Sequence, residues 1–244
     1  MVSVRCARVA CSSAELGKPT TVEENPSITQ VENYAGSLWV QHCVASVLTS
    51  YHVLSTAQCF SGDNYSDRNR RIRAGTSYRG TEGIVRDVYR VYIHPTFGEL
   101  EYDGDIAVVR LQEALTLGPT IQQAMILGQG IYLPTGLRLN LVSWGTTTVS
   151  YHPPALILII WVDEEQCINE YISVNVITEN MICAGLQASK GRDFDSRDVG
   201  APLFYSGVTM GIVSFGVSDG EDSIPVVSTA IASYSNWIVE TARY

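Results

Sequence analysis

The chain has 244 residues, of which 45% are hydrophobic and 17% charged, a balance that favours a large folded core and excludes a disordered chain. Its formal net charge of −9 argues against nucleic acid and anionic membranes as partners, because both require basic patches. No segment approaches the roughly 20 consecutive apolar residues of a membrane-spanning helix, so we expect no membrane span.

Residues 1–13 form an N-terminal extension to which the sequence assigns no role. They contain Arg5 and Arg8 but lack the apolar run of about 7–15 residues that an intact secretory signal requires. Cys6 and Cys11 also lie here. They are free to pair with each other, with another chain, or not at all.

The body of the chain consists of short runs rich in Val, Ile, Thr and Tyr, separated by Gly, Pro, Asn and Asp, and such runs predict strands. The predicted strand segments are 37–49, 51–56, 71–78, 84–94, 105–111, 137–145, 155–162, 202–216 and 224–230. Many short strands with frequent turns favour an all-β barrel or sandwich over a parallel sheet.

Two segments instead show helical spacing. In the C-terminal segment, Ile231, Tyr234 and Trp237 recur with a helical period, which predicts a helix at about 230–242 whose Trp237 face packs on the body. Residues 164–171 predict a second, short helix. A boundary between two barrel-sized halves falls near residues 122–130.

Four arginines form a dense basic run, which we interpret as a solvated loop face, with an anion-binding patch as the alternative. They are Arg68, Arg70, Arg71 and Arg73. The six cysteines show neither a C-x-x-C nor a Cys/His zinc spacing, so no metal and no other cofactor is expected. Asn64 begins a glycosylation sequon, Asn64-Tyr65-Ser66, which together with the cysteines favours an oxidising compartment.

A series of blocks resembles one known family. The blocks LTSYHVLSTAQCF, DGDIAVVRL, VSWGTTT, TENMICAGL and VGAPLFYSGVTMGIVSFG occur in the order found in chymotrypsin-fold serine proteases, with insect digestive trypsins resembled most. The resemblance runs from about Glu15 to the C-terminus and implies one homologous domain over residues 14–244. It implies two six-stranded antiparallel β-barrels, at about 28–122 and 130–230, and disulfides Cys43–Cys59 and Cys167–Cys183.

The same resemblance exposes the loss of two catalytic groups. In this family a histidine removes the proton of a serine that attacks the substrate carbonyl, and an aspartate orients the histidine. Asp105 matches that aspartate, but the histidine position holds Gln58 and the serine position holds Val199. A neutral amide accepts no proton near neutral pH and an isopropyl group attacks no carbonyl, so we expect neither step to occur.

Activation and oxyanion binding also depart from the family pattern. Arg197 occupies the oxyanion-loop position that is normally glycine, and Asp198 matches the aspartate that pairs with the new N-terminus after activation cleavage. The stretch that corresponds to that N-terminus is Ala14-Glu15-Leu16-Gly17, and Ser13 precedes it in place of a cleavable Arg or Lys. Either a basic group such as Arg197 compensates Asp198, or the loop stays zymogen-like.

The positions of the substrate pocket are partly retained. Asp193 matches the acidic base that gives trypsins their preference for Arg and Lys, and Ser214, Phe215 and Gly216 match the edge that pairs with an extended substrate. Val226 replaces a pocket-lining glycine and is expected to crowd the slot. We interpret Asp193 as a relic, with a working cation pocket as the alternative.

These departures predict a catalytically inactive serine protease homologue, extracellular, that binds or regulates an unidentified protein or peptide partner. The first alternative is a trypsin-like endopeptidase with residual or rescued activity, in which a Ser or Cys contacts one of the histidines near Asp105. Those histidines are His42, His52, His94 and His152. The second alternative is a storage or structural protein without a specific ligand.

Overall fold

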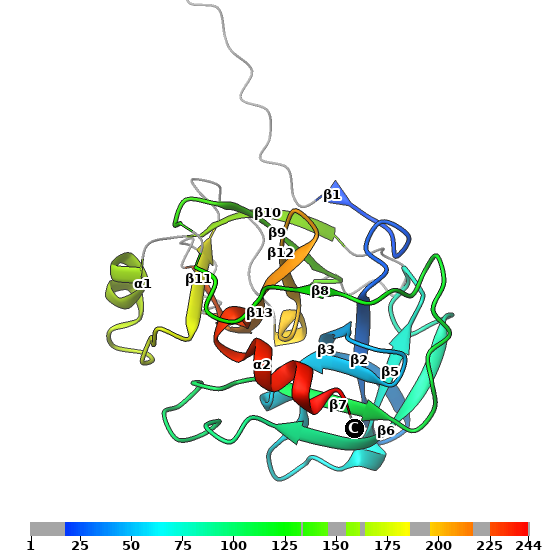
Figure 1. Ribbon diagram of the computed structural model, residues 1–244. Helices are drawn as coiled ribbons and strands as arrows, with labels where there is room; N and C mark the ends of the chain where they lie inside the picture. Colours follow the sequence, from blue (N-terminus) through cyan, green and yellow to red (C-terminus); the bar gives the residue numbers. More distant parts are fainter. Residues whose placement is uncertain are drawn as a thin grey trace, which may run out of the picture.

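The computed structural model describes residues 18–132, 134–145, 155–161, 164–185, 196–216 and 225–243, and it places two β-barrels side by side (Figure 1). The predicted pocket aspartate Asp193 lies outside the described residues, as do Cys6, Cys11 and His152.

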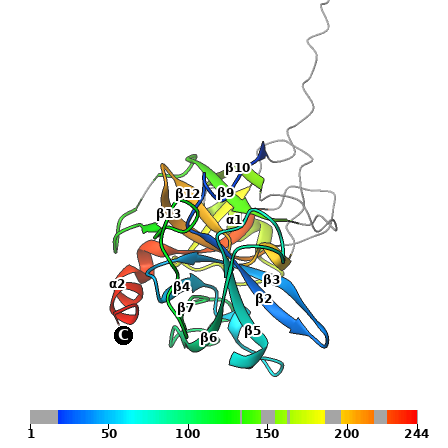
Figure 2. The same cartoon turned by 90° about the vertical axis from the view of Figure 1, so that its right-hand side faces the viewer.

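The first barrel is a closed ring of six antiparallel strands, seen in Figure 2. In ring order these are β2 (Ile28–Ala35), β3 (Leu38–Val47), β4 (His52–Ser55), β7 (Ala107–Leu111), β6 (Ile84–Ile93) and β5 (Arg70–Ala74). Apolar residues that alternate along the strands point inward, so that Val31, Val53 and Val109 are fully buried in its core.

The second barrel closes in the same way, because its first strand in the chain pairs with both its second and its fourth. Its ring consists of β9 (Arg138–Ser143), β10 (Ala155–Trp161), β11 (Met181–Gly185), β14 (Val226–Ala230), β13 (Val208–Phe215) and β12 (Pro202–Tyr205). Two-residue strands β1 (Lys18–Pro19) and β8 (Met125–Ile126) add to β10 and β13. The predicted fold class is therefore confirmed.

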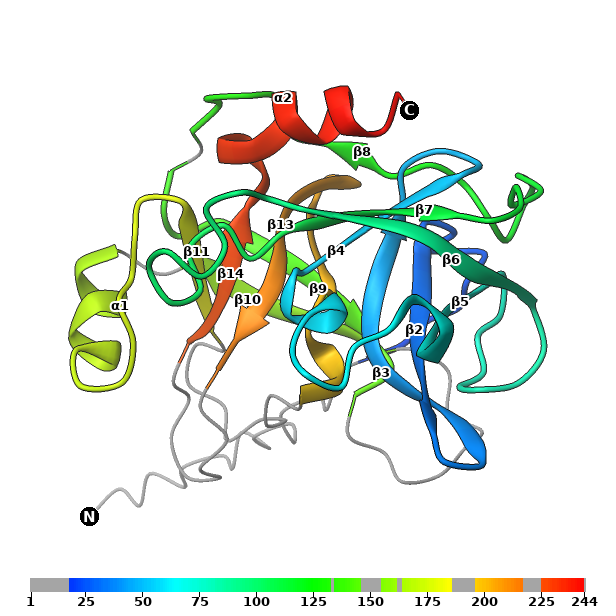
Figure 3. The same ribbon diagram turned by 90° about the horizontal axis from the view of Figure 1, so that it is seen from below.

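Both predicted helices are present. Helix α1 spans Glu164–Tyr171, and helix α2 spans Ile231–Thr241 and follows directly on β14. Although α2 emerges from the second barrel, it packs against the first: Ile231 and Ile238 share an apolar cluster with Leu54 of β4, and Figure 3 shows the helix lying across both barrels. No described helix is long and apolar enough to cross a membrane.

Both disulfides that the resemblance implies are present. Cys43–Cys59 ties β3 to a one-turn 3₁₀ helix, η1 (Gln58–Phe60), and Cys167–Cys183 ties α1 to β11. Cys59 of the first bridge directly follows Gln58 in the chain. It therefore fixes the backbone at the position where the family carries its catalytic base.

The interpretation of the arginine run as a solvated loop face is wrong for most of its members. Arg70 and Arg73 are buried, and only Arg68 is fully on the surface. Within β2, Glu32 is completely buried and its carboxylate accepts from Arg71 Nε at 2.5 Å and from Arg73 Nε at 2.7 Å. Arg71 and Arg73 of the run thus neutralise a buried glutamate. The sequence pattern does not reveal this pairing, because the two arginines lie 39 and 41 residues from Glu32.

We expect Glu32→Gln to lower the free energy of unfolding by about 2–3 kcal/mol. Removing one partner of a fully buried ion pair typically costs about 3–5 kcal/mol. The loss expected here is slightly smaller, because Arg71 keeps some contact with water. For a chain of this size the loss corresponds to a fall in Tm of about 4–12 °C, measurable by thermal unfolding.

The matched control is Glu113→Gln. Glu113 lies 3.9 Å from Arg86 and its side chain is 77% exposed, so its removal should change Tm very little. Equal shifts in the two variants would contradict a stabilising role for the buried Glu32 pairs.

Candidate functional site

Gln58 and Asp105 meet at the junction of the two barrels, together with Ser214. Gln58 begins η1 of the first barrel, Asp105 lies two residues before β7, and Ser214 lies on β13 of the second barrel. Two hydrogen bonds join Gln58 to Asp105, from backbone N to Oδ1 at 2.9 Å and from side-chain Nε2 to Oδ2 at 2.6 Å. The amide therefore stands where the resemblance placed the catalytic base, directly beside the orienting aspartate.

Asp105 is completely buried and surrounded by donors. Besides Gln58, the hydroxyl of Ser214 donates to Oδ2 at 2.5 Å. Burial raises the pKa of Asp105 above its ordinary value, and the hydrogen bonds from Ser214 and Gln58 act in the opposite direction. The carboxylate thus keeps the environment of an orienting group, although its partner is an amide.

The Gln58 amide is fully used as a donor. The same Nε2 that donates to Asp105 also donates to the carbonyl oxygen of Ser214 at 2.9 Å. These bonds reproduce the bridging role of a ring N–H, but they leave no basic lone pair, since an amide nitrogen accepts no proton. The Gln58 amide therefore links the first barrel to Ser214 of the second barrel.

Val199 lies just before β12, in a loop of the second barrel that contacts the first barrel. Its side chain is 5% exposed and packs in the first barrel's core beside the Cys43–Cys59 bridge. Its carbonyl accepts from Val44 N at 2.8 Å, and the next residue, Gly200, donates to Val213 O at 2.7 Å. A buried hydrocarbon therefore occupies the nucleophile position within a loop held by backbone hydrogen bonds on both sides.

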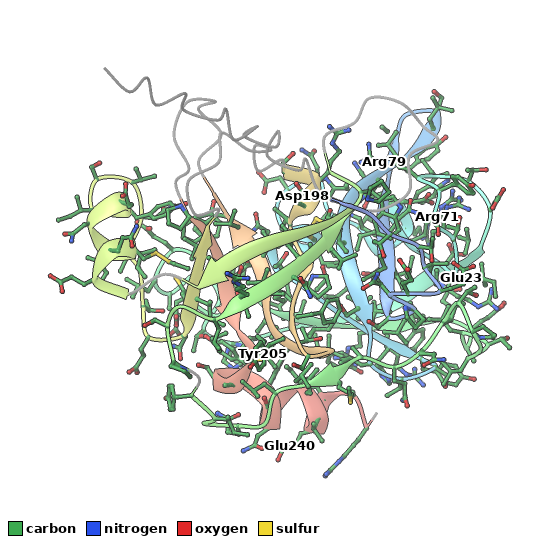
Figure 4. All side chains as sticks on the ribbon, turned by 90° about the horizontal axis from the view of Figure 1, so that it is seen from above. Glu23, Arg71, Arg79, Asp198, Tyr205 and Glu240 are labelled. Carbon is green, nitrogen blue, oxygen red and sulfur yellow. A yellow bond between two sulfur atoms is a disulfide. The ribbon has the colours of Figure 1, made fainter. Side chains whose placement is uncertain are left out.

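Arg197 and Asp198 belong to the 3₁₀ helix η3 (Ser196–Asp198), which lies between the barrels (Figure 4). Asp198 is buried, and Ser143 of β9 donates its hydroxyl to Asp198 Oδ1 in a short hydrogen bond. Ser143 stands just before Trp144 in the VSWG block, and nothing in its sequence surroundings predicts this contact. Compensation of Asp198 by Arg197 stays a prediction.

The retained pocket edge is packed with aromatic rings. Phe215 is buried, with its ring centroid 4.7 Å from that of Tyr102 and 5.5 Å from that of Tyr171. Gly216 follows it at the end of β13, and Val226 begins β14 and packs partly against the core of the second barrel. Crowding of the slot by Val226 stays a prediction, because the segments 186–195 and 217–224 lie outside the described residues.

His42 lies half-buried on β3, and the two other described histidines have threonine partners. His52 is buried and its Nδ1 lies 2.9 Å from Thr49 Oγ1, while His94 Nδ1 lies 2.8 Å from Thr96 Oγ1. Burial lowers the pKa of both imidazoles. Within the described part of the chain, no serine or cysteine side chain hydrogen-bonds to a histidine, and no group of His, Cys, Asp and Glu side chains is arranged to hold a metal ion.

Asn64, the sequon asparagine, lies on an exposed turn between η1 and the 3₁₀ helix η2 (Asp67–Asn69). Its backbone carbonyl accepts from the Asn69 side chain at 2.7 Å. An exposed turn suits the attachment of a glycan, since the bulky sugar needs free space.

Comparison with known proteins gives consistent matches along the chain. A family model described as Trypsin matches residues 17–238. The chain is 31% identical over 229 residues to "Trypsin, alkaline A" of Manduca sexta, covering 91% of this chain and 88% of that protein. It is 30% identical to "Trypsin CFT-1" of Choristoneura fumiferana, covering 93% of this chain and 90% of that protein.

Among solved structures, similar folds are found in scabies mite inactivated protease paralogues. Paralogue S-I1 superposes with a TM-score of 0.81 at 21% identity, covering 94% of this chain and 99% of that chain. Paralogue S-D1 superposes with a TM-score of 0.80 at 20% identity, covering 93% of this chain and 97% of that chain. At such identities the likeness is one of fold alone.

Proposed function

This chain belongs to the trypsin family, and from that premise we propose that it is a proteolytically inactive member that is secreted and acts by binding a protein or peptide. One observation carries the proposal: the Gln58 amide stands beside Asp105 with its nitrogen donating to both Asp105 and Ser214 O. An imidazole that donates to the aspartate keeps a second, basic nitrogen, whereas the Gln58 amide has none and cannot accept the proton of a nucleophile.

The nucleophile position supports the same conclusion independently. Val199 offers no attacking atom and is buried in the first barrel's core. Because base and nucleophile act as a unit, losing both removes about 10⁶-fold of rate enhancement. The intact barrels and disulfides around these positions favour a protein that retains a binding role over one that has lost all function.

Secretion is supported by the two disulfides and the exposed sequon. Cys43–Cys59 and Cys167–Cys183 form stably only in an oxidising compartment, and Asn64 is accessible to glycosylation. Mass spectrometry of the protein from culture medium, before and after glycosidase treatment, tests both statements. Retention of the protein inside the cells with reduced cysteines would contradict secretion.

The alternative of a rescued endopeptidase requires a serine or cysteine beside a histidine. His52 and His94 instead contact threonines, and the described side chains that donate to the Asp105 carboxylate are those of Gln58 and Ser214, so neither these two histidines nor His42 hydrogen-bonds to it. A rescued site therefore has no support among the described residues.

We expect no turnover of Arg- or Lys-containing peptide substrates and no covalent adduct with a fluorophosphonate. The protein is tested as purified and after limited digestion within residues 1–17, to imitate activation, with intact mass as the readout. An active trypsin carried through the same steps is the control. Turnover that the fluorophosphonate abolishes would refute the proposal.

A further inference from the structure

An apolar surface surrounds α1 and the neighbouring loop before β7. Five large apolar side chains, which we call the α1 face, are exposed there. They are Leu100 (46% exposed), Ile168 (40%), Ile172 (77%), Val174 (55%) and Val176 (43%). Ile168 and Ile172 are four residues apart, so they lie on one side of the helix and its C-terminal turn. Exposed apolar residues grouped in this way mark interaction surfaces.

The segments that carry the α1 face are joined into one platform. Val176 N donates to Glu101 Oε2 at 3.1 Å, and Thr178 Oγ1 donates to Asp103 Oδ1 at 2.6 Å. The Cys167–Cys183 bridge closes the same loop at its base. Figure 3 shows α1 and the loop before β7 on the same end of the molecule. The apolar residues are therefore held in place by neighbouring contacts.

The surroundings of the α1 face are acidic. Between residues 91 and 109 and between residues 164 and 185, the sequence contains no Lys or Arg. Exposed carboxylates in these ranges include Glu99, Glu170 and Glu179, and none of these three side chains makes a hydrogen bond or ion pair with the described residues. Like charges without local cations attract a partner of the opposite sign.

The α1 face also adjoins the former active site. Tyr102 of the loop and Tyr171 of α1 both contact Phe215, which continues β13 beyond Ser214. A partner on this face therefore lies next to the pocket edge while using contacts outside it.

We propose that the α1 face is the docking site for a cationic amphipathic segment of a partner protein, with apolar residues covering Ile172 and Val174 and Lys or Arg side chains meeting the surrounding carboxylates. This inference names the partner class for the binding role proposed above and rests on that role. Apolar contact supplies the affinity, and charge complementarity supplies the choice of partner and the rate of association.

The test measures binding of a short amphipathic leucine/lysine peptide to the full chain by fluorescence anisotropy. We expect Ile172→Ser with Val174→Ser to weaken binding by about 10-fold or more. Replacing Glu99, Glu170 and Glu179 by Gln should make the peptide affinity less dependent on salt concentration between about 0.05 and 0.3 M. Leu117→Ser is the control, because Leu117 is 45% exposed in the β7–β8 connection of the first barrel.

Three results would overturn the proposal: equal affinity for a leucine/glutamate peptide, unchanged affinity in the Ile172/Val174 variant, or self-association that this variant abolishes. The last result would assign the face to a second copy of the chain. The peptide is recovered and weighed after each measurement. Cleavage after its lysines would refute the proposed lack of proteolysis while leaving the docking result intact, so the two failures are distinguishable.

Discussion

Replacing Gln58 by His together with Val199 by Ser is expected to make the chain reactive towards a fluorophosphonate, whereas either substitution alone is expected to leave it unreactive. The parts that orient a base are still present: Asp105 is buried, accepts from Ser214 at 2.5 Å, and faces the position 58 side chain. A histidine there has a carboxylate to fix its tautomer. It becomes useful only when position 199 carries a hydroxyl for it to deprotonate.

The expected gain is limited by the oxyanion loop. Triad residues acting as a unit contribute about 10⁶-fold to the rate. An oxyanion donor that is out of place costs about 10²–10³-fold, and Arg197 lacks the backbone freedom of the glycine that the family has there. The double variant should therefore react about 10³–10⁴-fold faster than the parent chain, and the further change Arg197→Gly should raise this rate again.

Intact mass against time measures the reaction, and peptide mapping locates the adduct at position 199. The two single variants are the matched controls, because the base cannot act without a nucleophile to deprotonate and the nucleophile is not activated without the base. Reaction of the parent or of Gln58→His alone would reveal another nucleophile and refute the proposed inactivity. No reaction in the double and triple variants would show that the loop around position 199 no longer supports the chemistry.

Local patterns predicted the secondary structure well, because the period of apolar residues depends only on near neighbours. The helix expected at residues 164–171 is observed as α1 (Glu164–Tyr171), and the strand expected at 84–94 is observed as β6 (Ile84–Ile93). The segment 202–216 was predicted as one strand unit but forms two strands, β12 and β13. They are joined at Ser206 and Gly207, whose positive φ values of 49° and 80° reverse the chain.

Contacts between distant segments could not be predicted from these patterns. Ser143 and Asp198 are 55 residues apart, and Gln58 and Ser214 are 156 residues apart. The resemblance matched Gln58 and Asp105 to triad positions and Ser214 to the substrate-pairing edge, but the hydrogen bonds that join the three residues follow only from the folded geometry. The buried Glu32 was missed for the same reason, since nothing near it in the sequence supplies a cation.

Gly200→Ala is expected to be the most destabilising single substitution considered for this chain. Gly200 has φ +83°, and an added Cβ would lie 2.0 Å from Val44 O and 2.6 Å from Ser55 Oγ. Neither atom can withdraw freely, because Val44 O accepts a hydrogen bond from Ser55 Oγ and Val44 N donates to Val199 O. The substitution therefore pushes the loop that carries position 199 away from the first barrel.

The cost has two parts. A non-glycine residue at positive φ costs about 1–2 kcal/mol, and overpacking against fixed atoms costs about 3 kcal/mol at the upper end of its range. Their sum of about 4 kcal/mol or more corresponds to a fall in Tm of about 8–16 °C. Gly36→Ala isolates the first part, because Gly36 has φ +73° and an added Cβ there has no atom within 4 Å.

Thermal unfolding of both variants separates backbone strain from overpacking. We expect Gly36→Ala to lose less than half as much Tm as Gly200→Ala. Equal losses of Tm would mean that the loop after Val199 moves away from Val44 and Ser55 with little loss of stability. The contact between the two barrels at Gly200 would then not be rigid. In that case the frame assumed for restoring chemistry at positions 58 and 199 would also fail, because the nucleophile position depends on the same contact with Val44.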